Sequence, residues 1–78
     1  MVIKLELSNN IKEIRKSKGI TQTELALEAG LSQGRIANYE TSNIPISNMT
    51  LDVALRIARA LGSTIDEVFT SQMIEKED

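Results

Sequence analysis

The chain of 78 residues contains no cysteine, no histidine and no tryptophan, and it has a single proline. Without cysteine or histidine it has no disulfide, no thiolate or imidazole zinc site, and no nucleophile paired with a histidine base. These absences exclude most hydrolytic chemistry, so we expect a protein that is not an enzyme and needs no cofactor, metal or small-molecule ligand. Because the chain has one phenylalanine and one tyrosine, aliphatic side chains must build the core, which favours packed helices.

Long apolar runs are also absent. No uninterrupted apolar stretch exceeds three residues, whereas about 20 are needed to cross a bilayer, and the N-terminus lacks the layout of a signal peptide. We therefore expect a cytoplasmic protein with no membrane partner. The length suits one small domain over residues 1–78, with its core at residues 9–69.

Positive charge is scarce: the chain has nine Lys and Arg residues and eleven Asp and Glu residues, so its net charge is −2. A net negative charge is unusual for a nucleic-acid-binding protein. The distribution is uneven, however: residues 1–40 carry six basic and five acidic groups, and residues 41–78 carry three and six. We interpret residues 70–78 as an acidic tail, so the overall charge does not exclude DNA binding.

Periodicity and capping signals predict an all-α domain of five short helices. The first spans about residues 9–18, and the others follow caps at Thr21, Ser32, Thr50 and Thr64. The apolar face expected for the fourth helix comprises Leu51, Ala54, Leu55, Ile57, Ala58 and Leu61. Alternating apolar residues over 1–7 indicate a short strand, and residues 69–73 indicate a weaker second strand.

Residues 21–40 have the spacing of a helix-turn-helix. Ala26 is small where the two helices cross, and Gly30 suits the turn between them. The small core between the helices is assigned to Leu25, Leu31, Ile36 and Tyr39. Because the helix at residues 32–40 has only two large apolar positions, its outer face is free to enter a DNA major groove.

The sequence closely resembles the lambda-repressor/Cro-like (XRE) helix-turn-helix family over about residues 9–69. The motifs that carry the resemblance are Ile11-Lys-Glu-Ile-Arg15, Gly19-Ile-Thr-Gln22, Glu24-Leu-Ala26, Ala29-Gly-Leu-Ser, Tyr39-Glu40 and Leu55-Arg-Ile-Ala-Arg-Ala-Leu-Gly62. The resemblance implies a compact five-helix DNA-binding domain. It further implies a homodimeric transcriptional regulator, typically a repressor from a phage or mobile element, that binds a double-stranded DNA operator with residues 32–40 in the major groove.

The resemblance also assigns individual roles. Base-reading positions are Ser32, Gln33, Gly34, Arg35 and Asn38; phosphate-binding positions are Gln22, Thr21, Thr41 and Asn43; structural positions are Arg15, Ala26, Gly30, Ile36 and Glu40. Gln33 and Asn38 suit the hydrogen-bonding edge of adenine, and Arg35 suits guanine or a phosphate. Arg15 and Glu40 are expected to form an internal salt bridge. Gly34 departs from the family pattern, which often has a reading side chain there.

Two questions stay open at the level of sequence. The loop at residues 41–48 is neutral, so phosphate attraction is weak and two copies are expected to bind together. Their interface is either the fifth helix or a ribbon of the two terminal strands, although the same strands also suit pairing within one chain, over the edge of the core.

The alternative function is a protein-interaction module, such as an antitoxin or adapter, whose residues 75–78 bind a basic partner while DNA binding is secondary.

Overall fold

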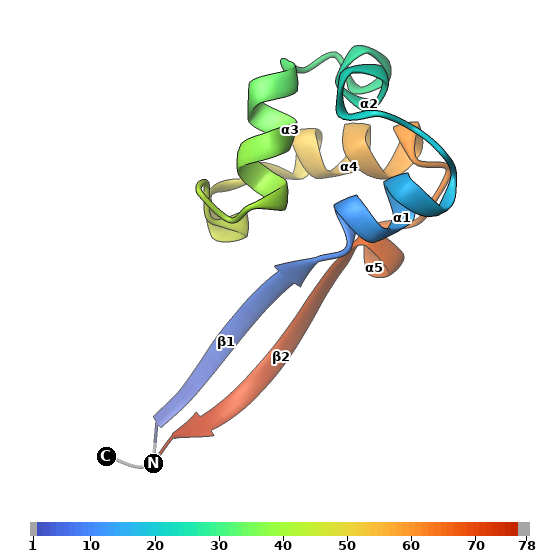
Figure 1. The fold of residues 1–78 in the computed structure, drawn as a ribbon. Coiled ribbons are helices and arrows are strands. Elements are labelled where there is room, and N and C mark those ends of the chain that lie inside the picture. The colour runs from blue at the N-terminus through green and yellow to red at the C-terminus, as the bar shows by residue number, and fades with distance from the viewer. Residues whose placement is uncertain (1, 77–78) are drawn as a thin grey trace.

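The computed structural model describes residues 2–76 and shows a helical body from which a two-stranded ribbon projects (Figure 1). The principal extents are 44 × 20 × 20 Å, so the molecule is elongated along the ribbon. The elements in chain order are β1 (Val2–Asn9), α1 (Ile11–Ser17), α2 (Gln22–Ala29), α3 (Gln33–Glu40), the 3-10 helix η1 (Ile46–Asn48), α4 (Leu51–Ala60), α5 (Ile65–Val68) and β2 (Phe69–Lys76).

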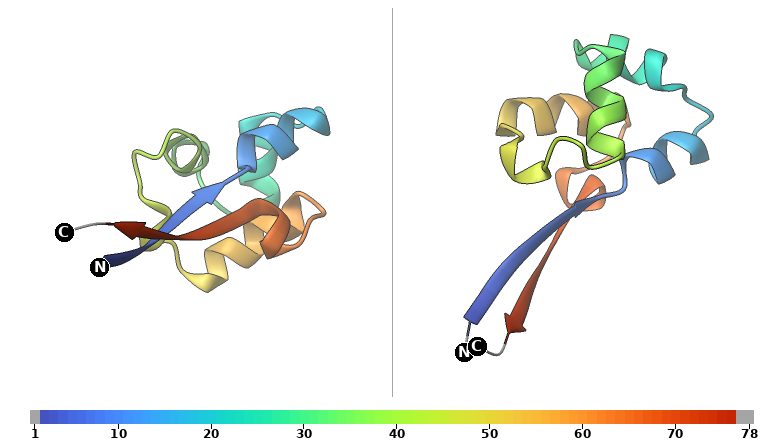
Figure 2. Two further views of the ribbon diagram at one scale, coloured as in Figure 1. Left: turned by 90° about the horizontal axis from the view of Figure 1, so that it is seen from below. Right: turned by 60° about the vertical axis from the view of Figure 1, so that its left-hand side comes forward.

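The ribbon is antiparallel and joins the two ends of the chain. Its register places Val2 opposite Lys76 and Asn9 opposite Phe69, and the strands extend side by side away from the helices in every view (Figures 1 and 2). The expected terminal strands are thus present within one chain, but they do not cover the edge of the core. Residues 70–76, expected to belong to an acidic tail, instead continue β2 because their backbone pairs with β1. Residues 77 and 78 lie outside the described residues.

Four helices begin as the capping signals predict, since Ser32 caps α3 by accepting from the amide of Arg35. Thr21 and Thr64 form complete capping boxes with the glutamates three residues later, and Thr50 accepts a hydrogen bond from the amide of Val53. The first helix begins later than predicted, at Ile11, because Asn9 still belongs to the ribbon.

The two asparagines before α1, Asn9 and Asn10, connect its start to other elements of the fold. The side chain of the N-cap residue Asn10 makes no cap bond, and its Nδ2 donates to the Glu67 carbonyl at 3.2 Å instead. The side chain of Asn9 accepts from the amide of Ile11 at 3.1 Å and donates to the Tyr39 carbonyl at 3.1 Å. These bonds tie the base of the ribbon to α1, α3 and α5.

One aliphatic core joins all five helices of the described residues. Its buried apolar members are Ile11, Leu25, Ala26, Ala29, Ile36, Tyr39, Val53, Ile57, Ala58, Leu61 and Val68. None of the helices within residues 2–76 has the length and hydropathy that crossing a lipid bilayer requires.

The predicted inner face of α4 is partly wrong. Leu51 and Leu55 are 69% and 40% exposed, and Val53 is buried in their place. Val53 and Ile57 are four residues apart and therefore lie on one face of the helix, which turns Leu51 and Leu55 toward solvent. Leu51 thereby lies at the surface beside Leu7 and Phe69, at the base of the ribbon.

Candidate nucleic-acid interface

The turn between α2 and α3 depends on Gly30. Its backbone is left-handed, with φ 69° and ψ 35°, a conformation that costs little only without a Cβ. The amide of Leu31 then donates to the Ala26 carbonyl at 2.9 Å, which closes the end of α2. Ala26 is 3% exposed at the core. These contacts fix the orientation of α3 relative to α2.

The outer face of α3 begins at its N-cap. Ser32 accepts a hydrogen bond from the amide of Arg35, and Ser32, Gln33, Gly34 and Arg35 are all exposed. Ile36 and Tyr39 hold the opposite face in the core at 0% and 2% exposure. A Cβ built on Gly34 meets no atom within 4 Å, so packing does not explain the glycine.

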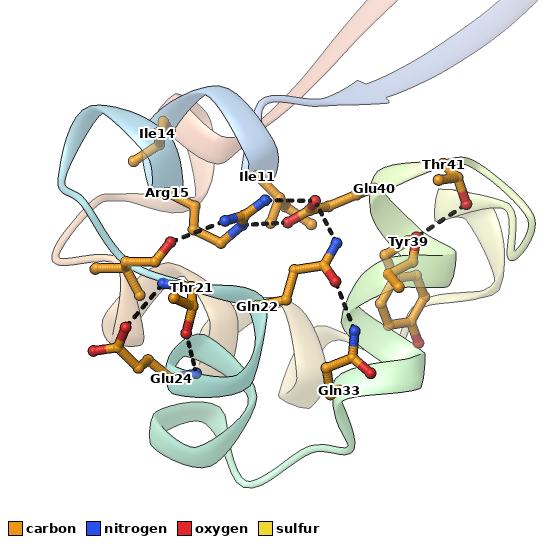
Figure 3. Close-up of polar contacts among 12 residues, drawn as sticks. Ile11, Ile14, Arg15, Thr21, Gln22, Glu24, Gln33, Tyr39, Glu40 and Thr41 are labelled. Carbon is orange, nitrogen blue, oxygen red and sulfur yellow. Dashed lines mark hydrogen bonds and ion pairs between the residues drawn. The ribbon is translucent and has the colours of Figure 1, made fainter.

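A chain of four polar side chains, which we call the polar chain, connects α1 to the start of α3 (Figure 3). It comprises Arg15, Glu40, Gln22 and Gln33. Arg15 donates to both carboxylate oxygens of Glu40, at 2.7 and 3.1 Å. Gln22 donates from Nε2 to Glu40 at 3.0 Å and accepts at Oε1 from Gln33 Nε2 at 2.7 Å. An exposed base-reading candidate is thereby tied to a buried ion pair.

The ion pair at the inner end is the salt bridge that the resemblance implied. The side chains of Arg15 and Glu40 are 10% and 2% exposed, and Arg15 also donates to the Ile20 carbonyl at 2.9 Å. Burial alone raises the pKa of Glu40, but hydrogen bonds from Arg15 and Gln22 outweigh it, and the net pKa is lowered. Glu40 therefore stays ionised and acts only as a hydrogen-bond acceptor.

The remaining base-reading candidates have partners within the domain. The guanidinium of Arg35 donates to the Tyr39 hydroxyl at 2.9 Å and lies 5.8 Å from the centre of that ring. Asn38 is half-buried, and its Oδ1 is 3.5 Å from the side-chain nitrogen of Asn43. Arg35 keeps further donors for a ligand, whereas the side chain of Asn38 is turned toward the loop after α3.

The phosphate-binding candidates lie at the ends of α2 and α3. Thr21 uses its oxygen to cap α2 and keeps its hydroxyl proton for another acceptor. Thr41 donates its hydroxyl to the Ala37 carbonyl at 2.9 Å, so binding a phosphate through that proton requires this bond to break. Gln22 uses one Nε2 hydrogen for Glu40 and retains the other. Asn43 is exposed.

Sequence reasoning missed the continuity of the polar chain. It gave three separate roles: phosphate binding to Gln22, base reading to Gln33, and a structural salt bridge to Arg15 and Glu40. The two glutamines are eleven residues apart, and only the turn at residues 30–32 brings their amides together. The sequence did contain one signal for this contact, because a glutamine stands at the start of each of two successive helices.

The fold and the exposed start of α3 define a domain of the helix-turn-helix class. The chain belongs to the helix-turn-helix family, since the family model of that description matches residues 11–68.

The chain is similar to two characterised proteins. It is 39% identical over 56 residues to antitoxin HipB of Escherichia coli (strain K12), a match covering 72% of this chain and 60% of HipB. The chain thus spans only 60% of the length of that curated relative. Among solved structures, it is similar to the restriction-modification controller protein C.AhdI from Aeromonas hydrophila. The TM-score is 0.68 at 29% identity, over 74% of this chain and 83% of that chain.

Proposed function

We propose that the protein is a homodimeric, sequence-specific transcriptional repressor that inserts α3 into the major groove of a double-stranded DNA operator. The observation that carries the proposal is the exposed start of α3, where Gln33 is held by the polar chain. A helix that buries one narrow stripe and exposes polar side chains on the other face suits the major groove. The matching family and the controller protein support the same assignment.

Gln33 is the principal base reader in this proposal. One Nε2 hydrogen is used by Gln22, which leaves Oε1 and the second Nε2 hydrogen free. This donor and acceptor pair matches the N7 and N6 groups of adenine. Ser32, Gly34, Arg35 and Asn38 are assigned to flanking base contacts, with the exposed surface of Gly34 allowing close approach to the groove.

Binding to the DNA backbone is assigned to Gln22, Thr21, Thr41 and Asn43. All four are uncharged, and neutral contacts release few counterions. Since a single domain then binds weakly, two copies on half-sites one helical turn apart, about 34 Å, supply the affinity. We place this activity in the cytoplasm, with the operator as the partner.

The test is selection of bound sequences from a random duplex pool at about 50 mM and about 150 mM salt, between which the electrostatic contribution falls steeply. We expect enrichment of an inverted repeat with an A·T pair at a fixed position in each half-site. No enrichment at either salt concentration, with the protein folded, would overturn the proposal.

A matched pair of variants links the selected sequence to α3. Gln33→Ala should lower discrimination at one base pair by about 1–3 kcal/mol. Gln72→Ala removes the same side chain from the ribbon, away from α3, and should leave the selected sequence unchanged. Equal effects of the two substitutions would contradict base reading by Gln33.

A second candidate function is that of an antitoxin, favoured by the 39% identity to HipB. In this case a protein partner is bound in addition to DNA, and the acidic C-terminal residues are the candidate contact with a basic surface. The selection experiment separates the repressor from an interaction module whose DNA binding is lost, because such a module enriches no sequence.

A further inference from the structure

Arg35 is the only basic residue of the helix-turn-helix, since no other lysine or arginine lies between Lys18 and Arg56 in the sequence. It stands in the first turn of α3, where it is exposed. No salt bridge within residues 2–76 includes its guanidinium. A full positive charge on the outer face of α3 is therefore available to DNA, and the direction in which it points matters for recognition.

One contact restrains this exposed side chain. Nη2 of Arg35 donates to the Tyr39 hydroxyl at 2.9 Å, and the guanidinium carbon lies 5.8 Å from the centre of the tyrosine ring, within cation–π range. Tyr39 is one helical turn further along α3 and only 2% exposed, so the core fixes its ring. A buried residue thus holds the only charged side chain on the outer face of α3.

The restrained arginine lies across α3 from Gln33. Successive residues of an α-helix are about 100° apart, so Gln33 and Arg35 are about 200° apart around the exposed side, with Gly34 between them. Gln33 is held by Gln22, and Arg35 is held by Tyr39. Two polar side chains restrained by intramolecular hydrogen bonds therefore border an exposed face that has no side chain at Gly34.

We propose that Tyr39 is a positioning residue for recognition, whose hydroxyl directs Arg35 to a guanine at a base pair other than the one assigned to Gln33. The inference rests on the proposed function and deepens it. A phosphate accepts hydrogen bonds from a cation in many orientations, whereas the O6 and N7 atoms of guanine require two parallel N–H donors in one plane. Fixing the direction of an exposed guanidinium therefore favours a base over the DNA backbone.

The contact with Tyr39 leaves Arg35 the donors that guanine needs. A guanidinium has five N–H donors, and Tyr39 accepts one hydrogen of Nη2. Whichever Nη2 hydrogen is used, one edge of the guanidinium keeps two parallel N–H bonds. The side chain is also ordered before binding, so less rotational freedom is lost when the complex forms. For one long side chain this effect corresponds to about a 2- to 12-fold gain in affinity.

The experiment measures the preference for G·C over A·T with duplexes changed at one position of the selected half-site at a time. Arg35→Ala identifies the base pair, because the preference for guanine there should fall by about 5- to 150-fold. Tyr39→Phe removes only the hydroxyl and keeps the ring in the core. It should lower the preference at the same pair by about 2- to 12-fold. Its circular dichroism, its affinity for a scrambled duplex and its preference at the Gln33 pair should match wild type.

Two further variants separate positioning from other roles. In the Arg35→Ala background, Tyr39→Phe has no guanidinium to position and should leave the base preference unchanged. Arg35→Lys keeps the charge but cannot form the bidentate pair, so it should retain affinity for scrambled DNA and lose the preference for guanine. A Tyr39→Phe protein that weakens binding to every duplex alike would overturn the positioning role. An Arg35→Ala protein that loses affinity uniformly, with a salt slope lower by about one, would place Arg35 on a phosphate instead.

The contact itself is tested without DNA. NMR relaxation of the arginine Nε–H groups measures how ordered each side chain is on the ps–ns timescale. Arg35 should be more ordered than Arg59, an exposed arginine of α4, and Tyr39→Phe should abolish this difference. Equal order of Arg35 and Arg59 in the wild-type chain would refute the contact. Absence of sequence-specific binding by wild type would refute the proposed function, and the guanine contact with it, while the relaxation data would still decide the contact with Tyr39.

Discussion

Reversing donor and acceptor in the hydrogen bond between Gln22 and Gln33 should change the base that Gln33 prefers. The ionised carboxylate of Glu40 only accepts hydrogen bonds, so Gln22 turns Nε2 toward it and Oε1 toward Gln33. Gln33 must then donate to Gln22, and the donor and acceptor that remain suit adenine. The buried ion pair with Arg15 thus determines which atoms Gln33 offers to DNA.

The perturbation is Gln22→Lys, which replaces an amide that donates and accepts with an ammonium that only donates. The oxygen of Gln33 then turns toward the ammonium, and its nitrogen faces DNA with donors, which suits the O6 and N7 acceptors of guanine. A bidentate pair contributes about 1–3 kcal/mol of discrimination. We therefore expect the ratio of affinities for adenine and guanine at that position to fall by about 5- to 150-fold.

The assay is fluorescence anisotropy with two duplexes that differ only in an A·T or G·C pair at the position assigned to Gln33. The ratio of the two affinities is the readout, because the added charge strengthens binding to every sequence alike. Gln22→Met is the matched control: its thioether end cannot direct the amide, so adenine preference should weaken without a gain for guanine. An unchanged ratio in a folded Gln22→Lys protein would refute this reasoning.

Three further predictions concern the stability of the domain and the close approach of α3 to DNA. Gly34→Ala should raise thermal stability by up to about 1 kcal/mol, since the added methyl group meets no atom, while weakening operator binding; unimpaired binding would argue against close approach of α3 to DNA. Ala26→Leu should destabilise the helix crossing by about 1–3 kcal/mol in a denaturant titration, and an unchanged midpoint would contradict tight packing there. Because the folded-state pKa of Glu40 is lowered, its stabilisation is present above its unfolded pKa of about 4.3 and is lost as the pH falls through the lower folded value. Melting temperatures measured from about pH 6 to about pH 3 should show this loss, with Glu40→Gln less sensitive to pH.

The sequence by itself determined the helical body. Caps at Thr21, Thr50 and Thr64 and the left-handed turn at Gly30 depend on neighbours within a few residues, so local chemistry suffices to predict them. The placement of Ile36 and Tyr39 in the core follows from helical spacing and the small number of large apolar residues in α3. These features are the ones that define the helix-turn-helix.

Only the tertiary structure decided the contacts between segments far apart in the chain. The periodicity of α4 did not reveal that Val53 rather than Leu51 faces inward, because the inner face depends on how α4 packs against α2. The alternation in β1 did not reveal whether its apolar face is covered, since cover comes from elsewhere in the chain or from another copy. The amide directions of Gln22 and Gln33 depend on a carboxylate eighteen residues from the first of them. Local patterns select the elements, and long-range packing and hydrogen bonding select which of their faces are available to DNA and to a partner.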